Sequence, residues 1–241
     1  MFATAFRGPG EIMKRLLWIT TLIPLFAVIS QQSKAVEVTV GEVQINLAAP
    51  KGYCPLDKQN SAERQVLDAM QQVNQGRTEE LGAFAQCDRL KDWREGKADD
   101  LGNTADYQVS LNMKGRRLSA EREIPGMCAT FRKQGAAIVR DMKEENKKRV
   151  ESVEIFAKNV KLNSQKMYGV LHEDKSGCYV GFVQKLAIND KMETVFIVSA
   201  ITVVKNKMIF FYHGSTLDGP SAIQRLLATS RATVEATLAQ N

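Results

Sequence analysis

The stretch that most constrains the fold of this chain is residues 193–204, where almost every side chain is apolar. An apolar run of this length, bounded by polar turn residues, predicts a β-strand that is buried on both faces. Such a strand lies inside a sheet, and that sheet has to be covered on both sides.

Turn signals on either side of this run predict its neighbours. Short strand-like segments alternate with turn residues, which is typical of an antiparallel meander. A helix with an apolar stripe then starts near Asp218-Gly219-Pro220-Ser221 and closes the chain. The four expected strands are 166–172, 178–186, 193–204 and 208–212, and the turns are 174–177, 189–190 and 205–207.

The first half of the chain mixes strands and helices. Valines alternate with polar residues before Gly41-Glu42 and again after it, but one residue out of frame, which indicates a bulge or a tight turn. The expected elements are strands at 36–40 and 43–47, a helix from Asn60 or Ser61 to Gly76, a strand at 80–86, a short helix that Asp88 caps and Gly96 ends, a loop at 97–106 and a strand at 107–113.

Residues 129–153 predict the most charged helix. Basic and acidic side chains are mixed along it, with Ala136, Ile138, Val139 and Met142 on an apolar side. We interpret the charges as a solvated face with pairs at i and i+4. The alternative is a surface that docks an acidic partner or lipid headgroups.

These elements predict an α+β fold. Its antiparallel sheet carries the C-terminal four-stranded meander, and helices cover both faces, as in an α/β/α sandwich. We expect residues 36–241 to form a single globular domain, since that length is sufficient for one substantial core.

Residues 1–35 predict an export signal that is removed from the mature protein. Met13-Lys14-Arg15 supplies the positive region, residues 16–29 are apolar, and Ser33-Lys34-Ala35 offers a cleavage site, with a cut after Ser30 as the alternative. Spanning a membrane takes roughly 20 apolar residues, so a retained anchor is the less favoured interpretation. Residues 1–12 do not resemble a signal start, and we expect the natural start to be Met13.

Export changes the charge of the working protein. The chain has 33 basic and 27 acidic residues, a net charge of +6. Residues 1–35 hold four of the basic residues and one of the acidic ones, so 29 and 26 remain in residues 36–241. A net charge of +3 on an exported protein argues against nucleic acid as a partner. We predict a periplasmic or secreted protein that meets the membrane only through its signal.

The four cysteines all lie in the mature chain, and an even number in an exported protein predicts disulfides. Four cysteines allow three pairings. We favour Cys54–Cys87 with Cys128–Cys178, because nested or crossed pairs would tie the two halves together less economically. No two cysteines have C-x-x-C spacing and the chain has two histidines, which argues against a metal-binding or catalytic thiol.

No set of residues predicts a reaction. His172-Glu173-Asp174 is the densest group of potential metal ligands, but it sits at a turn where all three are expected to be solvated. His213 is expected at the rim of the core, and His213, Ser215 and Asp218 are too close in sequence for a catalytic triad. We therefore predict no catalytic residue, no metal and no cofactor.

One surface is a candidate for binding a ligand. Tyr53 and Trp93 each lie near a cysteine and are expected mainly to pack against a disulfide. With Arg94 they could instead offer aromatic rings and a guanidinium to a ligand, on a surface made rigid by a Cys54–Cys87 bridge.

Three segments carry a resemblance to a known family. They are residues 49–57 (APKGYCPLD), residues 92–96 (DWREG), and the C-terminal meander with its closing helix. Together they resemble an uncharacterised family of exported proteobacterial proteins. The element order is also similar to the Mog1/PsbP-like α/β/α sandwich, whose members are mostly binding or assembly-helper proteins. The resemblance implies no catalytic residue.

We therefore predict a non-enzymatic exported binding or accessory protein, with an unknown protein or small-molecule partner in the cell envelope. The alternatives are a secreted enzyme or inhibitor with an unfamiliar site, and a protein that interacts with the envelope or a host through the helix at 129–153.

Overall fold

The computed structural model describes residues 35–74, 76–152, 160–188, 191–219 and 221–241, without the side chains of 141–152, 160–161 and 188. Residues Ser33–Asn241 form one compact unit. The predicted export signal, apart from Ala35, and the predicted turn at 189–190 lie outside the described residues.

A seven-stranded antiparallel sheet runs through the unit in the order β3-β4-β5-β9-β8-β7-β6. Its last four strands along the chain form the predicted meander. The apolar run that predicted a central strand is β8, which lies between β7 and β9. The strands are β3 (Tyr53–Pro55), β4 (Thr78–Gln86), β5 (Thr104–Ser110), β6 (Val160–Asp174), β7 (Gly177–Ile188), β8 (Lys191–Val204) and β9 (Lys207–Thr216).

The C-terminal helix α5 (Ala222–Ala239) covers one face of the sheet, which we call the α5 face. The hairpin of β1 (Val36–Val40) and β2 (Val43–Leu47) covers the same face. Tyr107 on β5 ties these parts together, because its hydroxyl lies 2.9 Å from the Ala48 carbonyl oxygen and 2.8 Å from Thr237 Oγ1 on α5.

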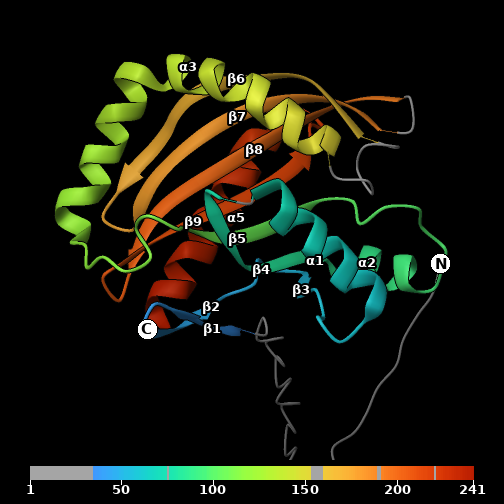
Figure 1. Cartoon of the computed structure of the whole chain (residues 1–241), viewed down its shortest axis with the longest axis horizontal. Helices are drawn as coiled ribbons and strands as arrows, with labels where there is room; N and C mark the ends of the chain where they lie inside the picture. Colours follow the sequence, from blue (N-terminus) through green and yellow to red (C-terminus); the bar gives the residue numbers. More distant parts are fainter. Residues whose placement is uncertain (1–34, 75, 153–159, 189–190, 220) are drawn as a thin grey trace, which may run out of the picture. The chain divides into compact units, whose positions relative to one another are not determined.

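Three helices cover the opposite face, which we call the α1/α3 face: α1 (Ser61–Asn74), α2 (Cys87–Arg94) and α3 (Ala120–Ser152). Strand alternation separates the two faces: on β8, Ala200 packs in the α5-face core and Ile201 packs beneath α3. Figure 1 shows α1 and α5 on opposite sides of the strands. The predicted α+β fold with helices on both faces is confirmed.

Helix α3 lies close to the edge strand β6. A Cβ atom at Gly135 would come within 1.9 Å of Met167 Sδ on β6, so a larger residue at this position would require the flexible Met167 side chain to move. The helix also begins earlier than residue 129, at Ala120, and includes Pro125. A proline there removes one backbone hydrogen bond, and the burial of Ile124 and Cys128 against the sheet offsets that cost.

The predictions for one turn, two helix caps and one strand end have different outcomes. Gly41, with φ of +64°, makes the tight turn between β1 and β2 rather than a bulge. Asn60 caps α1, since its Oδ1 accepts hydrogen bonds from the backbone N–H groups of Ala62 and Glu63. Asp88 does not cap α2: the cap residue is Gln86, and Asp88 lies in the first turn. The strand predicted to reach residue 113 ends at Ser110.

Two disulfides brace the α1/α3 face. Cys54–Cys87 joins β3 to the start of α2, and Cys128–Cys178 joins α3 to β7. They are the two pairs favoured from the sequence. Cys128 and Cys178 are fully buried, so the second bridge also forms part of the core beneath α3.

Removal of the Cys128–Cys178 bridge is expected to destabilise the protein. The bridge closes a loop with a sequence separation of 50, for which the chain-entropy model gives about 4 kcal/mol. The paired substitution Cys128→Ala with Cys178→Ala should therefore lower the free energy of unfolding, measured by urea denaturation, by about that amount or more. A midpoint equal to that of the unsubstituted protein would contradict this.

Candidate functional site

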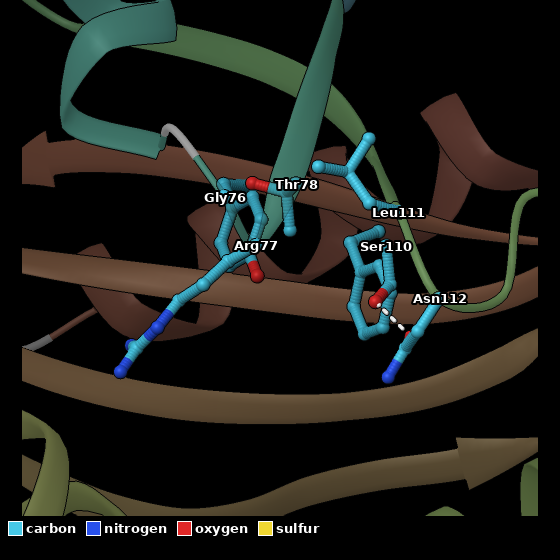
Figure 2. A pocket seen from close by; sticks show the side chains of 8 residues that line it. Gly76, Arg77, Thr78, Ser110, Leu111 and Asn112 are labelled. Carbon is cyan, nitrogen blue, oxygen red and sulfur yellow. Dashed lines mark hydrogen bonds between the residues drawn. The ribbon is translucent and has the colours of Figure 1, made fainter.

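An open pocket of about 530 Å³ lies on the α1/α3 face. The turn after α1 and the end of β5 form its two sides, and β9 forms its floor. Figure 2 shows Thr78 and Leu111 facing one another across it, while the Arg77 side chain extends away from Leu111. The lining residues are Gly76, Arg77, Thr78, Ser110, Leu111, Asn112, Phe210 and Tyr212.

The pocket has an apolar part and a polar part. Leu111, Phe210 and the ring of Tyr212 supply the apolar surface, and Leu111 is 45% exposed. Its exposure follows from the end of β5 at Ser110, since the chain turns there instead of continuing the ladder. Ser110 and Asn112, whose side chains are hydrogen-bonded at 2.6 Å, belong to the polar part.

Next to the pocket lies a group of polar residues that we call the carboxyl cluster: Glu80, Asp106, Gln108 and Tyr212. Neighbouring strands bring them together, because Gln108 is paired with Glu80 on β4 and Asp106 with Tyr212 on β9. Tyr107, between the two β5 members, points to the α5 face, so strand alternation directs Asp106 and Gln108 to the α1/α3 face.

A chain of hydrogen bonds leads from the pocket wall to this cluster. Thr78 Oγ1 donates to Gln108 Oε1 at 2.8 Å, and Gln108 Nε2 donates to Asp106 Oδ2 at 2.7 Å. Tyr212 belongs to both the pocket and the cluster, and its hydroxyl is hydrogen-bonded to Ser199 on β8. A molecule in the pocket would therefore contact Thr78, which is hydrogen-bonded to the cluster, and Tyr212, which belongs to it.

Glu80 is the enclosed member of the cluster. Both of its carboxyl oxygens are inaccessible to solvent and lack a side-chain partner, and the backbone of Gly82 only partly offsets the effect of burial on the carboxyl. Burial, and then the charge of Asp106, raise the pKa of Glu80 well above its ordinary value. Burial likewise raises the pKa of Asp106 to about 7, against an opposing hydrogen bond from Gln108. Two neighbouring acids with raised pKa values are a recognised mark of functional sites.

Sequence reasoning missed this cluster. Residues 97–106 were expected to form a loop, which placed Asp106 outside the sheet, whereas β5 begins at Thr104. A signal was present: Asp106 alternates with the apolar residues Ala105 and Tyr107 in strand register. The sequence pattern does not show that this polar residue is enclosed, because its enclosure depends on the helices that cover the α1/α3 face.

The three residues predicted to bind a ligand do not share one surface. Tyr53 packs in the core of the α5 face, and its hydroxyl is 2.9 Å from His213 Nε2. Trp93 packs on the α1/α3 face in the cluster that includes Cys54. Arg94 forms two hydrogen bonds of 2.8 Å to the fully buried Glu63 of α1. A ligand role for these residues stays a prediction.

His172, Glu173 and Asp174 are half-buried rather than solvated, because α5 and α3 provide partners. Asp174 accepts hydrogen bonds from Arg231 of α5 and Ser176, and it lies 3.0 Å from His172 Nε2. Burial alone would raise the pKa of Asp174, but these bonds together lower it to about 2. Glu173 pairs with Arg132 of α3 at 2.7 Å, so these contacts tie the β6–β7 turn to both helices.

His213 lies in the core rather than at its rim. It is 2% exposed, contacts Tyr53 and Ser230, and burial lowers its pKa to about 4, which keeps the ring neutral. Ser215 donates to the Thr216 carbonyl oxygen, and Asp218 pairs with Arg225. His213, Ser215 and Asp218 therefore have separate partners.

Two other kinds of feature are absent from the described residues. No group of three or more His, Cys, Asp or Glu residues there is arranged to hold a metal ion. No helix in the same part of the chain combines the length and apolar character that a membrane crossing requires.

We predict that Asp106 makes stability depend on pH. With a pKa of about 7 in the folded protein and about 3.9 when unfolded, Asp106 holds a proton in the folded state that it loses on unfolding between those values. The free energy of unfolding therefore falls as pH rises from about 4 to 7. Asp106→Asn should remove this fall, and its gain over the parent protein should be largest at pH 8.

Urea denaturation at pH 5 and pH 8 measures this effect. The difference between the parent protein and Asp106→Asn measures the contribution of Asp106 together with its effect on the neighbouring Glu80, whose pKa the charge of Asp106 raises. Asp218→Asn, at an exposed carboxyl, is the control that should follow the parent protein. An Asp106→Asn variant with the same pH dependence as the parent would contradict the prediction.

Comparison with known proteins adds little. No protein-family model matches the chain, and no curated protein matches it. Among solved structures it is similar to the solution structure of cyanobacterial PsbP (CyanoP) from Synechocystis sp. PCC 6803, at 10% identity and a TM-score of 0.38. The match covers 83% of this chain and 91% of that one. A TM-score at this level assigns no function, and membership of an exported proteobacterial family stays a prediction.

Proposed function

We propose that this chain is an exported binding protein for a small amphipathic molecule, which it holds in the pocket on the α1/α3 face. The observation that carries the proposal is the exposed apolar surface of Leu111, Phe210 and Tyr212 beside an enclosed carboxyl cluster. Small-molecule sites combine such an apolar wall with a few polar groups that orient the ligand.

The size of the pocket supports this proposal. Its volume of about 530 Å³ lies within the roughly 300–1,000 Å³ of most small-molecule sites. Among the described residues, Leu111 is one of four large apolar side chains with substantial exposure, along with Tyr168, Met192 and Leu217. A ligand over Leu111 would remove apolar surface from water, at roughly 25 cal/mol per Å².

An acid–base enzyme is the second candidate, and the carboxyl cluster is the observation in its favour. Asp106, with a pKa raised to about 7, can exchange a proton near neutral pH, and burial also raises the pKa of the neighbouring Glu80. Neither carboxyl lines the pocket, however, and both Glu80 oxygens are inaccessible to solvent. A general acid or base has to reach its substrate, so we favour binding over catalysis.

Export is supported by the two disulfides, since such bonds persist in oxidising compartments. The first strand, β1, begins at Val36, directly after the proposed cleavage site. We expect a chain expressed from Met13 to appear in the periplasm or medium with Val36 as its first residue. N-terminal sequencing of the exported protein measures this, and a peptide that starts upstream of Ser30 would contradict it.

A pair of matched variants tests the pocket. Leu111→Asp puts a charge on the apolar wall, while Leu217→Asp makes the same change at a similarly exposed site outside the pocket, 41% exposed against 45%. Native mass spectrometry of protein purified from exporting cells should show a bound small molecule on the parent and on Leu217→Asp. We expect Leu111→Asp to lose it.

Two results would overturn the proposal. One is a protein that carries no small molecule and whose thermal midpoint no member of an amphipathic compound panel raises. The other is Leu111→Asp binding as the parent does. Circular dichroism of both variants separates loss of binding from loss of fold.

A further inference from the structure

We infer that the ligand of this pocket brings a hydrogen-bond donor, such as a hydroxyl group or an amide N–H, to the side-chain oxygens of Thr78 and Ser110. This inference rests on the proposed function and names the chemical class of the ligand. It follows from the direction of the hydrogen bonds that the pocket residues make with their own neighbours.

Strand pairing places the two hydroxyl groups next to each other. Thr78 on β4 is the cross-strand partner of Ser110 on β5, and both residues line the pocket. Side chains of such partners lie on the same face of a sheet, with their Cβ atoms roughly 5 Å apart. A molecule in the pocket can therefore meet both hydroxyl oxygens at one place on its surface.

The Thr78 hydroxyl group uses its proton within the protein. Gln108 donates its Nε2 hydrogen to Asp106 Oδ2 at 2.7 Å, which leaves its Oε1 directed to Thr78. An amide oxygen can only accept, so the Thr78 hydroxyl donates to it, at 2.8 Å. Since a hydroxyl group has one proton and two lone pairs, Thr78 Oγ1 offers lone pairs to a ligand.

The Ser110 hydroxyl group is used in the same way. It donates to Asn112 Oδ1 at 2.6 Å, the dashed line in Figure 2, and so it too offers lone pairs. Two backbone N–H groups of the lining also have acceptors: Arg77 donates to Asn74 at 3.1 Å, and Leu111 donates to Arg77 at 2.9 Å. Figure 2 shows the side-chain nitrogens of Arg77 and Asn112 directed away from Thr78. The wall formed by Thr78 and Ser110 therefore presents acceptors.

An amphipathic molecule with a donor fits both parts of the pocket. Its apolar body would lie on Leu111, Phe210 and the ring of Tyr212, beside the two hydroxyl oxygens. A ligand without a donor would displace water from these oxygens and leave their hydrogen bonds unreplaced, which lowers affinity. Recognition thus depends on hydrogen bonding by residues that line the pocket.

Two isomeric probes test the need for a donor. They are 3-phenylpropan-1-ol and (2-methoxyethyl)benzene, which have the same atoms, a phenyl ring and one oxygen, but only the alcohol has a donor. Isothermal titration calorimetry at pH 8 should show the alcohol binding about tenfold more tightly than the ether. At this pH Asp106 is largely ionised and can only accept, which keeps the Gln108 amide in the described orientation.

Variants then locate the acceptors. The double substitution Thr78→Val with Ser110→Ala removes both hydroxyl oxygens and should bring the affinities for alcohol and ether to about the same value. The matched control is Ser215→Ala, which removes a hydroxyl group on β9 outside the pocket and should keep the tenfold preference. Circular dichroism checks the fold. If the double variant does not fold, Ser110→Ala alone takes its place and should lower the preference.

Equal binding of alcohol and ether to the parent protein would overturn this inference and leave the pocket as a binding site. A folded double variant that keeps the tenfold preference would also overturn it, because the acceptor would then lie elsewhere. If neither probe binds, the inference fails, and the proposed function is then judged by the co-purified molecule and Leu111→Asp. Failure of the class of ligand is therefore distinguishable from failure of the site.

Discussion

The pairing of β5 with β9 is the contact on which the rest of the structure depends. It joins strands β3, β4 and β5 to the C-terminal meander through the ladder from Ala105–His213 to Gln108–Phe210. Neither disulfide crosses this ladder: Cys54–Cys87 lies on the side of β3 and β4, and Cys128–Cys178 lies on the side of the meander. The two halves of the sheet are therefore held together by backbone hydrogen bonds and by the side chains packed over them. Asp106 and Tyr212 become neighbours only because this ladder has its observed register.

The C-terminal half could be predicted from local patterns. Turn residues and runs of apolar side chains specify a meander whose strands pair with their neighbours along the chain, and β6 to β9 follow that rule. The N-terminal half was less predictable, since β3 has three residues and β5 pairs with a strand about a hundred residues away. No local pattern encodes such a partner. The disulfide pairs fit the sequence expectation because each lies within one half.

The candidate site could not be predicted from local sequence patterns of this kind. Strand alternation assigns Asp106 and Gln108 to one face of β5, but an antiparallel strand commonly exposes that face to water. Here α1 and its neighbours cover it, so the same residues become an enclosed polar group. Tyr53, Trp93 and Arg94 illustrate the reverse case. Their residue types suggested a shared surface, but Tyr53 and Trp93 pack on opposite faces of the sheet and Arg94 is engaged with Glu63.

The position of β9 has a consequence for the order in which the molecule assembles. During synthesis, β9 follows β5 by about a hundred residues, and α5 follows later still. Until then β5 is an unpaired edge strand, and the α5 face beneath it lacks its helix. Chains that stop before β9 would expose that edge to other chains, which is a recognised route to aggregation. Strand β9 and helix α5, which are synthesised last, therefore protect strand β5, which is synthesised earlier.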